Sequence, residues 1–180
     1  EDKNIDVPEG RITKDNYFAI GDYRIKRGKG SVRWPAPEKT MPVRTYKVMK
    51  LLWLKSVLLG EHPLSIGPTG SVKTTMAMDF LINDLGLDPE TQRAHYNTDA
   101  FDFLQRLEIK DMRTRWDDQD FVKGMRKGNP TFVDELDKPK NPAHFGAVNQ
   151  ATGSGWLVLP NGEVLIARPG WFLVAACNYP

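Results

Sequence analysis

Apolar residues follow two alternating patterns along the chain, one typical of helices and one typical of buried strands. Spacings of three and four residues predict helices over 45–59 and 74–85, and a glycine directly after each predicts its end. The continuous apolar run WFLVAAC (171–177) predicts a strand buried on both faces, and HPLSIG (62–67) and TFVD (131–134) are further strand candidates. Helices that alternate with such strands predict an α/β fold built on a parallel sheet.

Other patterns predict further elements between these strands. Asn161 and Gly162 join two β-rich runs over 156–167, and this pair is a strong hairpin signal. The other expected elements are a strand over 93–97, a helix capped by Asn97 or Thr98 that runs through Leu107, a helix opened by Asp117 or Asp118 that runs to Lys127, and a helix opened by Asn141 and Pro142 that runs to Ala151.

The first part of the chain is basic and rich in turns. Residues 22–50 hold nine Lys or Arg against only Asp22 and Glu38. We expect residues 1–44 to be a solvated basic segment packed beside a main domain that spans 45–180. A nucleic-acid contact is the alternative, although the segment lacks the regular aromatic interleaving that single-strand binding favours.

Composition narrows the classes of function. A length of 180 residues suffices for one domain with a real core. The net charge of +2 argues against nucleic acid as the main partner. No apolar run approaches the ~20 residues of a membrane-spanning helix. The single Cys177 favours a reducing compartment, so we expect a cytoplasmic protein without membrane contact. The chain starts at Glu1 and stops at Pro180, which we interpret as a fragment cut at both ends.

One octapeptide carries phosphate chemistry. Residues 67–74 read GPTGSVKT, between a predicted strand and a predicted helix, as in the P-loop pattern GxxxxGK[ST]. Such a loop aims backbone N–H groups at a phosphate, and the helix behind it adds its positive end. We expect Lys73 to reach the β- and γ-phosphates of a nucleotide, and the Thr74 hydroxyl to bind Mg²⁺. The expected phosphate-binding residues are Gly67, Pro68, Thr69, Gly70, Ser71, Val72, Lys73, Thr74 and Thr75.

Val72 departs from the motif, which has glycine at this position. Glycine allows a close approach to phosphate, or backbone angles that a β-branched residue resists. We therefore expect Val72 to block or distort the loop, at a cost of a few kcal/mol. A chance glycine-rich turn between strand and helix is the alternative interpretation of the octapeptide.

Two further strand ends carry polar side chains. Asp134 and Glu135 end the run TFVDE, 61 residues after Lys73. At the carboxyl edge of a parallel sheet, Asp134 can hold Mg²⁺ through its water shell and Glu135 can polarise an attacking water. Asn178 ends the run WFLVAACN, where a neutral amide can orient that water. The alternatives are an ordinary loop start for the carboxylates and a turn residue for Asn178.

Together these residues resemble the AAA+ ATPases, and most of all the MoxR, CbbQ and cobaltochelatase-small-subunit group, also called dynein-related or midasin-like. The resemblance covers residues 45–180. LSIGPTGSVKTT is similar to Walker A, TFVDELDKPKNPAHFGAVNQA to Walker B with its following helix, and FLVAACNYP to sensor 1. GWLVLPNGEVLIARPG resembles the hairpin that this group inserts before sensor 1, and the stretch 97–129 resembles a family helix interrupted by an insert.

The resemblance implies a three-layer P-loop core with a central parallel sheet of strand order 5-1-4-3-2, here without the C-terminal lid. It implies ATP and Mg²⁺ as cofactors, with Thr74 and Asp134 at the metal and Lys73, Glu135 and Asn178 in catalysis. It also implies a homo-oligomeric ring, usually a hexamer, that remodels a partner protein, often a metalloenzyme or chelatase. No arginine finger or second sensor can be placed in this sequence, so a neighbouring subunit is expected to supply that charge.

Two other functions remain open from the sequence. A degenerate Walker A at Val72 is compatible with a scaffold that keeps the fold and does not hydrolyse ATP. The basic segment is compatible with a P-loop motor that acts on nucleic acid.

Overall fold

The computed structural model describes residues 7–40, 43–140 and 143–178. The chain forms two compact units, of which the first comprises residues 1–63 and 72–88 and the second comprises residues 64–71 and 89–180. Each unit combines strands with helices. The division of the chain into a segment 1–44 and a core 45–180 stays a prediction.

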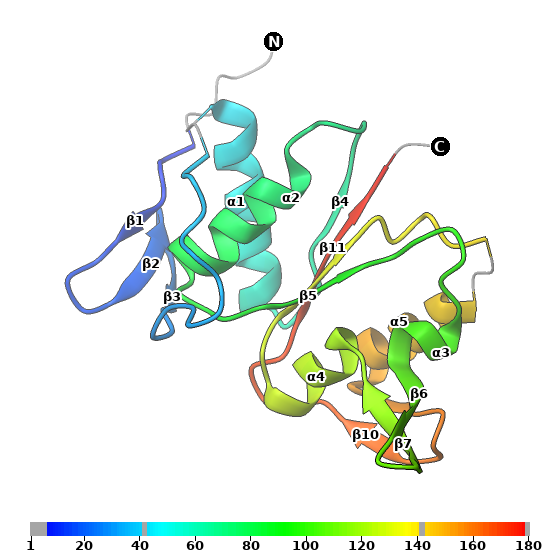
Figure 1. Cartoon of the computed structure of the whole chain (residues 1–180). Helices are drawn as coiled ribbons and strands as arrows, with labels where there is room; N and C mark the ends of the chain where they lie inside the picture. Colours follow the sequence, from blue (N-terminus) through cyan, green and yellow to red (C-terminus); the bar gives the residue numbers. More distant parts are fainter. Residues whose placement is uncertain (1–6, 41–42, 141–142, 179–180) are drawn as a thin grey trace. The chain divides into compact units, whose positions relative to one another are not determined.

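Four parallel strands form the sheet of the second unit (Figure 1). In spatial order they are β4 (Leu64–Ile66), β11 (Leu173–Cys177), β8 (Thr131–Asp134) and β5 (Glu90–Arg93). By position in the chain these are the first, fourth, third and second strands. The α/β class is therefore confirmed, and the order agrees with the predicted 5-1-4-3-2 except that no fifth strand occurs in the residues described.

Three helices complete the core of the second unit: α3 (Ala100–Leu104), α4 (Asp120–Lys127) and α5 (Ala143–Ser154). Helix α4 contacts β5 and β8, and its Phe121 and Met125 are fully buried at a four-residue spacing. It ends at Gly128, whose φ of 75° is the left-handed conformation that glycine adopts without strain. The expected cap of the last helix at Asn141 and Pro142 lies outside the described residues.

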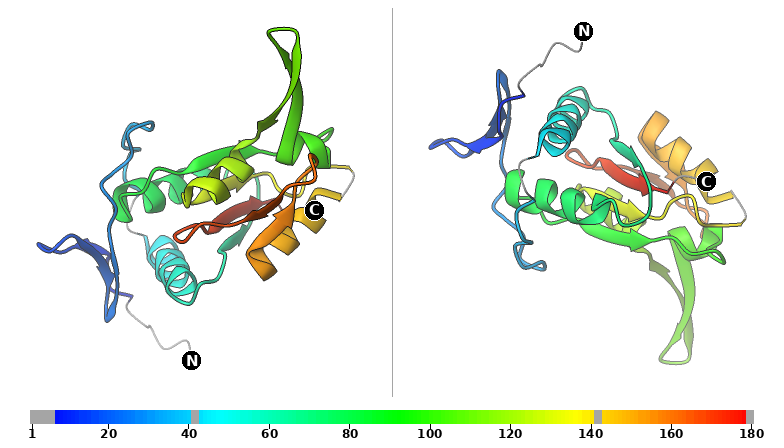
Figure 2. Two further views of the ribbon diagram at one scale, coloured as in Figure 1. Left: turned by 90° about the horizontal axis from the view of Figure 1, so that it is seen from below. Right: turned by 90° about the horizontal axis from the view of Figure 1, so that it is seen from above.

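Two antiparallel hairpins belong to the same unit. Residues Trp156–Val158 (β9) and Val164–Ile166 (β10) form the hairpin expected around Asn161 and Gly162. Residues Gln105–Lys110 (β6) and Arg113–Asp118 (β7) form a second hairpin, which projects from its unit in both views of Figure 2. The expectation of a helix through Leu107 is therefore wrong beyond Leu104, and the strand expected over 93–97 lies at 90–93 instead.

The first unit contains β1 (Arg11–Ile12), β2 (Tyr17–Ile20), β3 (Tyr23–Lys26), α1 (Arg44–Leu58), α2 (Lys73–Met78) and η1 (Asp79–Asp84). Helix α1 confirms the expectation for 45–59. Helix α2 confirms the start expected near 74, and it continues directly into the π-helical turns of η1. No helix within the described ranges is both long and apolar enough to cross a bilayer.

The N-terminal segment contributes buried residues to the first unit's core. Phe18 and Ile20 of β2 are buried, and the Phe18 ring packs edge-on against Phe80 of η1 at a centroid distance of 6.2 Å. Arg27 donates hydrogen bonds to the backbone carbonyls of Asn83 and Asp84 at 2.8 and 2.7 Å. A cation at these last carbonyls of a helix stabilises its negative end.

Candidate functional site

The carboxyl ends of β4, β11 and β8 lie side by side, because the three strands are parallel neighbours. Beyond the paired residues Ile66 and Cys177, the Gly67 N–H donates to the Cys177 carbonyl oxygen at 3.2 Å. The loop that leaves β4 therefore begins directly beside the end of β11. Polar residues that follow these strands meet at one edge of the sheet.

The turn after β8 contains the two predicted carboxylates. Asp134 ends the strand, and its Oδ1 accepts a hydrogen bond from the Glu135 backbone N–H at 2.9 Å. Glu135 has a φ of 54°, in the left-handed region that is uncommon for a residue with a side chain. The Glu135 carboxylate is held by Arg93 at the end of β5, with an Nε–Oε2 distance of 2.9 Å.

Asn178 follows β11 at the same edge. Its backbone N–H donates to Oδ1 of Asp137 at 3.0 Å, and its side-chain Oδ1 lies 3.5 Å from the hydroxyl of Thr69. Thr69 belongs to the loop after β4, and Asp137 belongs to the turn after β8. Asn178 thus contacts both neighbouring segments of the site.

The loop from Gly67 to Val72 contains two residues with positive φ. Gly70 has a φ of 80°, and no atom lies within 4 Å of the position that a Cβ would take there. Val72 has a φ of 60° and ψ of 17°, and its carbonyl accepts the first hydrogen bond of α2, from Met76 N–H at 2.9 Å. The position where the motif has glycine therefore has a backbone conformation suited to glycine.

A model of the AAA domain, dynein-related subfamily, matches residues 63–180. The chain belongs to this AAA family. The match covers about two thirds of the 180 residues and includes the loop after β4, the turn after β8 and the end of β11. No curated protein matches the chain.

AAA domains bind nucleotides, typically with Mg²⁺, and commonly assemble into rings. In this AAA chain, the second unit brings the loop 67–71 together with Asp134, Glu135 and Asn178. Lys73, Thr74 and Thr75 form the first turn of α2, directly after the loop in the chain but within the first unit. That Lys73 and Thr74 meet Asp134 around one triphosphate stays a prediction.

The donor set fits a magnesium nucleotide. A hydroxyl at Thr74 and a carboxylate at Asp134 are oxygen ligands of the kind that Mg²⁺ prefers. The open space beside Gly70 leaves room for a phosphate against the backbone. Within the described ranges, no group of three or more His, Cys, Asp or Glu is arranged to hold a metal ion.

Arg93 is a residue of this edge that the sequence did not reveal. Its hydrogen bond holds the pKa of Glu135 below the ordinary value for glutamate, and the carboxylate in turn raises the pKa of Arg93. Arg93 pairs with Asp134 in the β5–β8 register, which places it on the strand next to the turn after β8. The strand expected over 93–97 began at Arg93, whereas β5 ends there.

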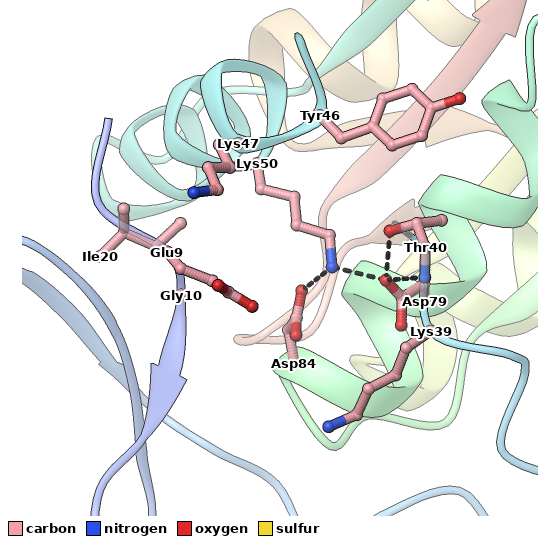
Figure 3. A pocket seen from close by; sticks show the side chains of 10 residues that line it. All are labelled: Glu9, Gly10, Ile20, Lys39, Thr40, Tyr46, Lys47, Lys50, Asp79 and Asp84. Carbon is pink, nitrogen blue, oxygen red and sulfur yellow. Dashed lines mark hydrogen bonds and ion pairs between the residues drawn. The ribbon is translucent and has the colours of Figure 1, made fainter. Parts of the chain in front are cut away.

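A second charged cluster lines a pocket of the first unit (Figure 3). The Lys50 ammonium lies 2.5 Å from Oδ2 of Asp79 and 2.6 Å from Oδ2 of Asp84. Burial raises the pKa of Asp84 to about 6, against the opposing charge of Lys50. Burial also acts to raise the pKa of Asp79, but hydrogen bonds from Lys50, Asn83 and Thr40 outweigh it and hold that pKa below its ordinary value. This cluster joins α1 to η1, the continuation of the P-loop helix.

Proposed function

We propose that this chain is the ATP-binding core of an AAA+ ATPase that couples ATP hydrolysis to the remodelling of a partner protein, in the manner of the MoxR and CbbQ group. The observation that carries the proposal is the meeting of the loop 67–71, the Asp134–Glu135 turn and Asn178 at one sheet edge. These segments are far apart in the sequence. A sheet edge of this kind is where P-loop proteins bind the triphosphate of a nucleotide.

In this proposal, the backbone of the loop and the Lys73 ammonium bind the phosphates, with Gly67 and Gly70 allowing close approach. The Thr74 hydroxyl and the Asp134 carboxylate hold Mg²⁺, which neutralises charge on the β- and γ-phosphates when bound.

The reaction itself requires a water held against the terminal phosphate. Glu135 accepts a proton from this water once its carboxylate is turned away from Arg93. Asn178 orients the same water through its side-chain amide, which adds no net charge. The roles of Glu135 and Asn178 rest on their positions at the ends of β8 and β11.

We further propose that the active form is a homo-oligomeric ring, as is common among AAA domains, with a hexamer as the expected size. An arginine from the neighbouring subunit then supplies the positive charge for the transition state. The partner protein is of the class that the MoxR and CbbQ group remodels, often a metalloenzyme.

Titration of the intact chain with ATP and Mg²⁺ in a calorimeter, together with an assay of phosphate release, tests the proposal. Lys73→Met is expected to abolish nucleotide binding, because the ammonium no longer neutralises the phosphates. Glu135→Gln is expected to bind nucleotide and release no phosphate. Lys26→Met removes an exposed lysine of β3 and serves as the matched control. Binding that survives Lys73→Met would contradict the proposed site.

Val72 supports a second candidate, a scaffold that keeps the AAA fold without hydrolysis. The φ of 60° at this β-branched residue places strain where the loop would meet phosphate. In that case the wild type binds no ATP in the calorimeter, and Val72→Gly restores binding.

A nucleic-acid motor is the third candidate, and the contacts of the basic segment argue against it. Arg27 is engaged with backbone carbonyls of η1, and Arg33 pairs with Asp88 at 2.9 Å. A motor of this kind requires nucleic-acid affinity that falls steeply with salt and depends on residues 24–33.

A further inference from the structure

The turn after β8 is fixed to the end of β11 by two hydrogen bonds. The Leu136 N–H donates to the Ala176 carbonyl, and the Asn178 N–H donates to Oδ1 of Asp137, both at 3.0 Å. The Lys138 N–H closes the turn onto the Glu135 carbonyl at 3.0 Å. These hydrogen bonds therefore hold the turn that carries Glu135 against the strand end that carries Asn178.

The bond from Asn178 to Asp137 differs from the others because its acceptor is a side chain. The last residues of β11 pair with β4, with Cys177 opposite Ile66. Asn178 lies one residue beyond that last pair, so its direction is not set by the sheet ladder. Asp137 supplies an acceptor at this point, and its hydrogen bond fixes the backbone N–H of Asn178.

The position of the Asn178 side-chain amide depends on this hydrogen bond of its backbone. The Cα–Cβ direction of a residue follows from its backbone, and the side chain of asparagine has few rotatable bonds. The Thr69 hydroxyl lies on the amide oxygen side, at 3.5 Å from Oδ1, which is a long contact. The 3.0 Å bond at the backbone is therefore the stronger of the two constraints.

We propose that Asp137 is a positioning residue, whose Oδ1 holds the backbone of Asn178 so that the sensor amide is aimed at the carboxyl edge of the sheet. This inference rests on the proposed ATPase function, because it gives the Asn178 amide a reacting water to orient. Asp137 itself does not touch the nucleotide in this scheme. It links the Walker B turn to the sensor strand, so that Glu135 and Asn178 keep a fixed separation.

Three variants of the full chain test the inference. Asp137→Ala removes the acceptor, Asp137→Asn keeps an Oδ1 acceptor without the charge, and Asp22→Ala removes an exposed carboxylate of the β2–β3 turn as the matched control. For each variant we would measure kcat and KM for ATP with Mg²⁺, and the exchange rate of the Asn178 amide proton by NMR.

Asp137→Ala is expected to lower kcat by roughly ten- to a hundredfold with KM nearly unchanged, because a misaimed group mainly affects the transition state. The backbone amide proton of Asn178 should exchange faster in this variant, because its acceptor is lost. Asp137→Asn should restore most of kcat and most of the protection, and Asp22→Ala should match the wild type.

Three results would overturn the inference: an unchanged kcat in Asp137→Ala, an Asn178 amide that exchanges at the wild-type rate in that variant, or a loss in Asp137→Asn as large as in Asp137→Ala. A wild type that binds no ATP overturns the proposed function instead. In that case the exchange rate of the Asn178 backbone amide proton still shows whether Asp137 holds the Asn178 backbone.

Discussion

Val72 is the residue at which the demands of sequence and backbone conflict most clearly. Its φ of 60° is a left-handed conformation, which costs an L-residue with a Cβ roughly 1–2 kcal/mol. Val72 is also 40% exposed, so burial of its side chain compensates little. The loop holds a left-handed backbone at Val72 although it lacks the glycine that this conformation favours.

Val72→Gly is therefore expected to raise the free energy of unfolding by ~1 kcal/mol, after the entropic cost of the added glycine. Urea denaturation followed by tryptophan fluorescence measures this change. Val32→Gly is the matched control, because Val32 is 95% exposed and outside the positive-φ residues, so that variant should be neutral or less stable. A Val72→Gly chain that is less stable than the wild type would show that the loop does not strain this residue.

Sequence reasoning placed Asp134, Glu135 and Asn178 at strand ends, as observed, because each lies at the end of a recognisable strand. It missed Arg93 and Asp137 because their roles depend on partners that are distant in sequence. Arg93 holds Glu135 across two adjacent strands, and Asp137 holds Asn178, which follows 41 residues later. No local pattern distinguishes such residues from ordinary surface charges.

At the scale of elements, the ion cluster of Lys50, Asp79 and Asp84 links α1 to η1. Lys50 bridges both carboxylates, and Lys39 contributes a further positive charge near Asp84. Because burial raises the pKa of Asp84 from 3.8 to about 6, the folded chain binds this proton more tightly than the unfolded chain. The contribution of Asp84 to stability is therefore full below pH 3.8 and is lost as the pH rises through about 6.

Asp84→Asn is expected to stabilise the chain at pH 8 by ~1–2 kcal/mol, because it removes a buried charge while Lys50 keeps Asp79 as its partner. The decline in stability between pH 4 and pH 6 should shrink in the same variant. Thermal unfolding across this pH range measures both effects. Asp22→Asn removes an exposed carboxylate of the same unit and should leave the pH profile unchanged; a matching change there would refute the assignment to Asp84.

Helices and strands were predicted well where one hydrophobic pattern continued through the whole element, and poorly where the pattern changed. The strand at 173–177 lies within a continuous apolar run, as expected of a strand buried on both faces. The helix expected through Leu107 failed because Phe103, Leu104 and Leu107 fit a helical spacing by chance. Leu107 instead faces Trp116 across the β6–β7 hairpin and is 58% exposed. Apolar residues on an exposed hairpin give no signal that separates them from core residues.

At the scale of the molecule, the N-terminal segment contributes buried core residues as well as charged ones. Phe18 and Ile20 are each 1% exposed, and Phe18 packs on Phe80 of η1, which continues the P-loop helix. The charge pattern suggested a separate arm because the basic residues are more conspicuous in the sequence than the few apolar ones. The apolar run YFAI has only four residues, too few to outweigh them.

Removal of residues 1–40 is therefore expected to lower the melting temperature by roughly 10 °C or to prevent folding, because a buried aromatic of this kind contributes ~3–5 kcal/mol. Differential scanning calorimetry of the shortened chain measures the effect. Phe18→Ala should reproduce much of the loss, whereas Ile12→Ala, at a side chain that is 50% exposed, should lower the melting temperature little. A shortened chain that melts like the wild type would favour a separate segment after all.

The β6–β7 hairpin is held to its unit by polar contacts at its base. Gln105 and Asp118 hydrogen-bond each other there at 2.7 Å, and Asp118 pairs with Arg126 of α4 at 2.7 Å. The tip is different, since Met112 is 92% exposed and sits in a left-handed turn with Asp111. Added residues at this tip would disturb no core contact, so the turn is a suitable place for a dye or an affinity tag on an otherwise intact chain.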